Sequence, residues 1–88
     1  MKFKYVILEE PVEKRERVFV IDGGMNHSDL VNHFPKWKPV SAGFCTIDCY
    51  NEDDFEHPKV QAWGESISIG VKSREEDASI ISRHLTAV

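Results

Sequence analysis

Small residues occupy every second position of a segment that reads as a strand leading into a helix. They are Gly64, Ser66, Ser68 and Gly70. Alternate residues of a continuous strand point to the same side, so these four would form one face without bulky side chains. A second chain can approach the backbone closely at such a face. We therefore expect this segment to contact a partner protein.

Ser66 could act as a nucleophile only if the fold supplied a sharp turn and a base. The stretch Gly64-Glu65-Ser66 is similar to the first part of a nucleophile elbow, but Ser68 stands where that motif has its second glycine. Ser66 also lies within the expected strand. Nothing in the spacing of the four histidines groups one of them with Ser66 and an acid. We expect no catalytic residue and a protein that is not an enzyme.

Metal binding has two candidate regions, and neither has the required spacing. His27 and His33 are six residues apart on an expected helix, a rotation of about 600°, so they point to different sides and we expect both at the surface. The acidic run from 51 to 58 lacks the central glycine of a calcium-binding loop. We expect no metal and no cofactor. The acidic run should instead be an exposed loop, with three residues that contact the partner protein: Asp53, Asp54 and Phe55.

Ser73 and Arg74 offer a different kind of site, at the start of the last expected helix. Free backbone amides, a hydroxyl and a guanidinium at a helix N-terminus can bind a phosphate or carboxylate. Three acids follow directly and oppose an incoming anion: Glu75, Glu76 and Asp77. Arg74 and Asp77 are three residues apart and can pair with each other. A small-ligand, nucleotide or anion site at Ser73 and Arg74 is therefore the alternative to partner binding.

Composition and charge bound the class of protein. The chain has 88 residues, of which 41% are hydrophobic and 30% charged, as expected for one globular domain over residues 1–88. A net charge of −4 with scattered basic residues argues against general nucleic-acid binding. No apolar run is long enough to span a membrane, and the basic start is not followed by the apolar segment that a signal peptide requires. We expect a cytoplasmic protein.

Cys45 and Cys49 lie in one expected strand, four positions apart. At a rise of ~3.3 Å per residue their Cα atoms would be about 13 Å apart, beyond the limit of about 7 Å for a disulfide. We expect reduced, buried thiols.

The elements follow in the order β-β-α-β-β-α. Strands are predicted over 2–8, 17–21, 40–50 and 59–71. A short helix is expected to begin after Asn26 and to end before Pro35. The last helix is expected from Ser73 to Val88, with Ser73 and Glu76 forming a capping box. This pattern predicts an α+β fold, in which a largely antiparallel four-stranded sheet carries both helices on one face.

Two segments carry a resemblance to a known family. Pro39-Val40-Ser41-Ala42-Gly43-Phe44 and the stretch from Gly64 to Asp77 resemble small, uncharacterised proteins encoded by tailed phages and prophages. The resemblance implies a phage accessory or host-takeover context and a host-cell cytoplasmic location. It implies no catalytic residue. Together with the small-residue face, it leads us to expect a protein-interaction module that forms a homodimer.

Overall fold

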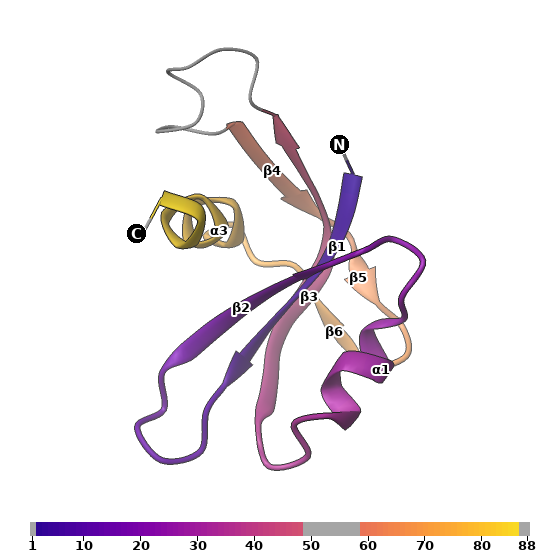
Figure 1. Ribbon diagram of the computed structural model, residues 1–88, viewed down its shortest axis with the longest axis vertical. Coiled ribbons are helices and arrows are strands. Elements are labelled where there is room, and N and C mark those ends of the chain that lie inside the picture. The colour runs from indigo at the N-terminus through magenta and orange to yellow at the C-terminus, as the bar shows by residue number, and fades with distance from the viewer. Residues whose placement is uncertain (1, 49–58, 87–88) are drawn as a thin grey trace.

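A four-stranded antiparallel sheet forms the centre of the fold (Figure 1). The computed structural model describes residues 2–48 and 59–86. The strands are β1 (Lys2–Glu9), β2 (Glu16–Ile21), β3 (Lys38–Asp48) and β4 (Lys59–Trp63), in the spatial order β2-β1-β3-β4. All three neighbouring pairs are antiparallel. The predicted α+β class with a four-stranded antiparallel sheet is confirmed.

The two helices cover opposite faces of this sheet (Figure 1). The helix α3 (Asp77–Thr86) packs on the face that holds Tyr5 and Ile7, whereas α1 (His27–Asn32) packs on the face that holds Val6 and Leu8. The expectation of both helices on one face is wrong. The physical reason lies in β1, where four consecutive apolar side chains are buried, so that both faces of the central strand need a cover.

The expected strand over 59–71 is also wrong, because it is broken at Gly64. The backbone of Gly64 has φ of +86°, in the left-handed region that ends an extended run. Beyond it, β5 (Glu65–Ser66) and β6 (Val71–Lys72) form a separate antiparallel hairpin. This hairpin contributes Ile69 and Val71 to the core beneath α1, which explains how so short a helix can cover one face.

The start of α3 lies later than the capping box predicted. The first helical residue is Asp77, and its backbone N–H donates to the carbonyl of Arg74 at 3.1 Å. Its carboxylate accepts the backbone N–H of Arg74 at 2.9 Å, so the return bond of a capping box forms one residue further along than Ser73 and Glu76. At α1, Asn26 is the N-cap as expected, although its side chain makes no capping hydrogen bond.

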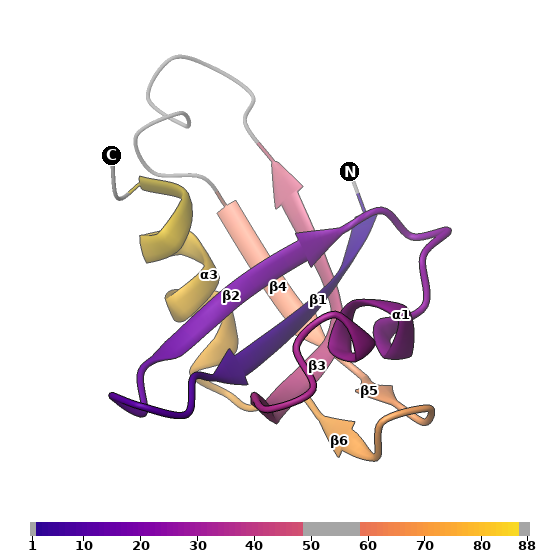
Figure 2. The ribbon, with the colours of Figure 1, turned by 60° about the horizontal axis from the view of Figure 1, so that its bottom comes forward.

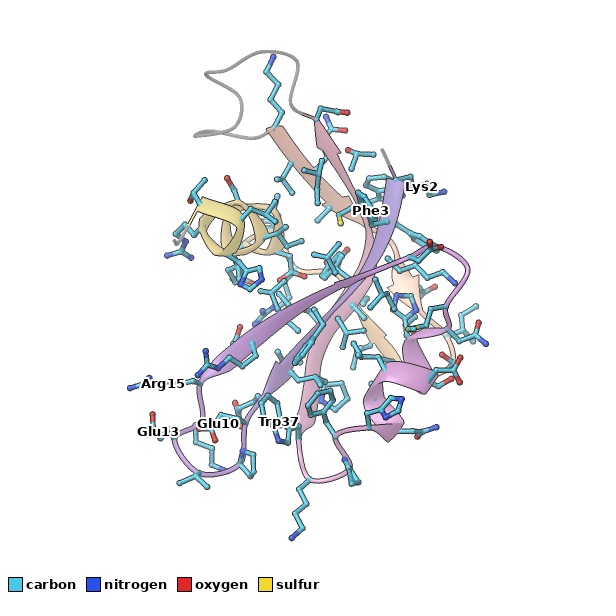
Figure 3. The ribbon with its side chains drawn as sticks, viewed as in Figure 1. Lys2, Phe3, Glu10, Glu13, Arg15 and Trp37 are labelled. Atoms are coloured by element: carbon cyan, nitrogen blue, oxygen red, sulfur yellow. The ribbon has the colours of Figure 1, made fainter. Side chains whose placement is uncertain are left out.

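The connection between β1 and β2 is a long turn (Figure 3). The Glu10 carboxylate accepts the backbone N–H groups of Val12 and Glu13. Lys14 has φ of 62°, an uncommon conformation for a residue with a side chain. The N–H of Glu10 donates to the carbonyl of Arg15 at 2.9 Å and closes the turn.

Cys45 is a free, buried thiol, and Cys49 lies outside the described residues. Burial raises the pKa of Cys45 to about 11. Within residues 2–48 and 59–86, no helix is long and apolar enough to cross a membrane. The same residues contain no cluster of His, Cys, Asp or Glu that could hold a metal ion.

Candidate functional site

The small residues at 64, 66, 68 and 70 do not form one strand face. Gly64, with φ of +86°, precedes β5, and Gly70, with φ of +69°, ends the turn between β5 and β6, where its N–H donates to the carbonyl of Ser66 at 3.0 Å. A Cβ at Gly64 would lie only 3.0 Å from the Phe44 ring. These glycines are therefore explained by turn geometry and close packing, and the premise of a bare strand face is wrong.

The two serines of this segment lie together but in different surroundings. Ser66 is buried and Ser68 is exposed, with their Oγ atoms 3.2 Å apart. They line an open cavity of about 440 Å³ that also reaches Lys4 and His27. The Lys4 ammonium already donates to the carbonyl of Met25 at 3.0 Å.

His27 is buried, contrary to the expected surface position. Its Nε2 lies 3.0 Å from the carbonyl oxygen of Gly43. Because a carbonyl only accepts, Nε2 carries the proton and donates in this bond. The imidazole thus ties α1 to β3, and within the described part of the chain no hydrogen bond joins it to Ser66.

Arg74 is held by carboxylates, which opposes its use as an anion site. Its guanidinium donates to both oxygens of Glu16, at 2.8 and 3.2 Å, and its Nε donates to Asp77 at 3.0 Å. The expected pairing of Arg74 with Asp77 is confirmed. The bond to Glu16 is the largest reason why the pKa of Arg74 is raised and that of Glu16 lowered. The backbone N–H of Ser73 donates to the carbonyl of Gly64 at 2.9 Å and that of Arg74 to the Asp77 carboxylate at 2.9 Å, so neither amide is free to bind an anion.

A buried hydrogen-bond chain begins at this same corner, and sequence analysis found only part of it. Asp77 is fully buried and accepts the Tyr5 hydroxyl at 2.5 Å, in addition to two donors of Arg74. Burial and this hydrogen bond raise the pKa of Tyr5 well above its ordinary value. The contact joins residues 72 positions apart, which no local pattern could reveal. Its effect is to fix α3 against the centre of the sheet.

Another hollow lies along the outer edge of β2. It is an open groove of about 640 Å³. Residues of β2 form its floor, Ile80 of α3 lies on one side, and Trp37 from the other sheet face lies on the opposite side. Figure 2 shows β2 as an outer strand of the sheet, with β1 on its inner side. Of the site residues predicted from the sequence, none that the structure describes lines this groove.

The wall of the groove at Trp37 is built from three aromatic rings in mutual contact. The ring centroid of Phe34 lies 5.0 Å from that of Trp37 and 5.0 Å from that of Phe19. Phe19 and Trp37 also meet directly, at 6.2 Å in an edge-on arrangement. Such mutual contacts hold the rings in place, so this wall is formed before any partner arrives.

In an antiparallel pair of strands, residues that hydrogen-bond to the neighbouring strand alternate with residues whose backbone N–H and C=O point away from it. This alternation identifies the backbone groups of β2 that face the groove. The N–H of Glu10 donates to the carbonyl of Arg15, so this pair is of the hydrogen-bonded type. Counting along the register in steps of two makes Arg17 and Phe19 the β2 residues that bond to β1. The backbone N–H and C=O of Val18 and Val20 therefore point outward. The structure gives these groups no partner among the described residues.

Asp53, Asp54 and Phe55 lie outside the described residues. Their predicted contact with a partner, like that of the small residues in the hairpin, stays a prediction.

Comparison with known proteins adds no assignment. No protein-family model, no curated protein and no solved structure matches the chain.

Proposed function

We propose that this protein is an interaction module that binds an extended segment of a partner protein, which adds to β2 as a fifth strand. The observation that carries the proposal is the apolar groove along the free edge of β2. Strand addition joins a partner through backbone hydrogen bonds and selects it through pockets for alternate side chains.

The edge of β2 has what strand addition requires. Its register with β1 is continuous over six residue pairs without a bulge, and its sequence contains no proline. Bulges and prolines are common devices that prevent an edge strand from pairing with another chain. The outward N–H and C=O groups of Val18 and Val20 are spaced to bond to an added strand. Val18 and Phe19 point to opposite faces of the sheet, so side chains on both sides of that strand find an apolar surface.

The phage or host-takeover context implied by the resemblance is part of the proposal, as is a host-cell cytoplasmic location. In that context the partner segment would belong to a host protein. A homodimer is an alternative occupant of the groove. We do not propose the anion site at Ser73 and Arg74, since carboxylates already occupy the Arg74 guanidinium.

Selection from a displayed library of random peptides of about ten residues, long enough to pair with all of β2, tests the proposal. Selected peptides should bind Val18→Pro about tenfold or more weakly than they bind Val18→Ala, because only proline also removes an outward N–H. Both variants lose valine packing, so Val18→Ala is the matched control. Circular dichroism establishes that each is folded.

A second readout does not depend on any variant. Amide hydrogen exchange of the natural chain should slow at Val18 and Val20 when a selected peptide binds, while Arg17 and Phe19, already bonded to β1, should change little. Failure to select any peptide, or bound peptides that leave Val18 and Val20 unprotected, would overturn the proposal.

A further inference from the structure

We infer that the partner segment is negatively charged, with a carboxylate opposite Arg17 and apolar side chains opposite Val18 and Phe19. This inference rests on the proposed strand addition at β2 and specifies the chemistry of the partner. It follows from the charges that surround the groove and from their state of pairing.

The groove has basic residues at its rim that no acid of the described chain neutralises. Arg17 and Arg83 line it, both exposed, and neither forms an ion pair within residues 2–48 and 59–86. His84 lies beside them. The acidic residue that lines the groove, Glu16, is already paired with Arg74 at 2.8 Å. The chain as a whole has a net charge of −4, so this groove is locally opposite in sign to the protein.

Other arginines of the chain do form ion pairs with acids. Arg15 pairs with Glu13 at 2.8 Å in the turn before β2, and Arg74 forms ion pairs with three acids. Free cations beside an apolar groove favour an acidic partner, because opposite charge guides association and selects against basic segments.

The positions of the side chains specify where the charge should lie. Residues directly opposite each other on neighbouring strands interact on the same face of a sheet. Arg17 shares a face with Phe19 and the Trp37 wall, so an acid opposite Arg17 would stand next to an apolar residue that packs on those rings. On the sheet face covered by α3, an apolar side chain of the partner segment would contact Val18 and Ile80, and Arg83 would lie at the rim of this contact.

A second copy of this chain fits the groove less well. Two β2 strands paired about a two-fold axis would bring Arg17 and Arg83 of both copies into one interface. Like charges placed together at an interface weaken association. An acidic segment of another protein therefore suits the groove better than β2 of a second copy.

The same peptide selection tests this inference with charge variants. Selected peptides should be enriched in Asp and Glu over the starting library. The double variant Arg17→Glu/Arg83→Glu should weaken their binding about tenfold at low salt, and added salt should shrink this difference. The double variant Lys59→Glu/Lys72→Glu makes the same change of charge at two exposed lysines outside the groove and should change binding less than about twofold.

The outcomes separate this inference from the proposal on which it rests. Peptides that lose binding to Val18→Pro but show no acidic enrichment, or bind Arg17→Glu/Arg83→Glu equally well, would overturn the acidic partner and leave strand addition standing. Absence of any β2-dependent peptide would overturn both. A dimer in sedimentation that Val18→Pro abolishes and Val18→Ala retains would make a second copy the occupant and overturn the acidic partner.

Discussion

Removal of the Tyr5 hydroxyl tests whether the buried contact with Asp77 fixes α3 on the sheet. In Tyr5→Phe the ring remains and the 2.5 Å hydrogen bond to the carboxylate is lost. Both side chains are fully buried, so water cannot replace the donor. A hydrogen bond to a charged group contributes about 1.5 to 3 kcal/mol, and we expect the free energy of unfolding to fall by about 2 kcal/mol.

The effect of Asp77→Asn should be larger. The amide removes the negative charge that Arg74 and Tyr5 share and turns an N–H toward at least one donor. Loss of one partner of a buried ion pair costs about 3 to 5 kcal/mol. Because Arg74 is partly exposed and keeps Glu16, we expect the low end, about 3 kcal/mol. That is a large share of the roughly 4 to 13 kcal/mol expected for a domain of this size.

Urea unfolding at pH 7, followed by far-ultraviolet circular dichroism, measures these differences. Glu76→Gln is the matched control, because Glu76 is exposed and its nearest contact with Arg74 is longer, at 3.4 Å; we expect a loss below about 0.5 kcal/mol. The double variant Tyr5→Phe/Asp77→Asn should lose less than the two single losses added together. Equal stabilities of Tyr5→Phe, Glu76→Gln and the natural chain would refute the reasoning.

Three further predictions concern the backbone and pH. Gly43→Ala should lower the free energy of unfolding by about 1 to 3 kcal/mol, because its Cβ would run into a backbone carbonyl of β4, whereas Gly23→Ala, with open space around it, should not; thermal unfolding compares them. Lys14→Gly should raise the melting temperature slightly and Lys14→Ala should not, since the left-handed conformation at 62° costs about 1 to 2 kcal/mol with a side chain. Burial raises the pKa of Cys45 from 9.0 to about 11 and that of Tyr5 above 10.0, so the folded chain keeps protons that the unfolded chain releases. Stability should therefore be complete below about pH 9 and fall as pH rises, less steeply in Tyr5→Phe; unfolding curves that do not change between pH 8 and about 11 would contradict this.

Local sequence patterns were enough to predict most of the elements. The apolar runs of β1 and β2 and the apolar spacing in α3 each depend on residues within a few positions of one another. These patterns led to the confirmed α+β class and to the pair between Arg74 and Asp77. They failed at Gly64, where period-two spacing continued through a residue whose positive φ ends the strand.

The candidate site could not be predicted, because it is assembled from distant parts of the chain. The groove joins β2, Trp37 and the last turns of α3, and its outward amides depend on which neighbour β2 has. The cover of both sheet faces likewise depends on where α1 and α3 pack, which their own apolar stripes do not specify.

The sequence by itself determined which segments extend, which coil and where the thiols and charges lie, since each follows from near neighbours and intrinsic preference. Only the tertiary structure decided that Asp77 is buried against Tyr5, that the small residues serve a hairpin, and that two arginines flank an unpaired strand edge. The physical reason is that burial, pairing and the free edge of a sheet are properties of contacts between segments far apart in the chain.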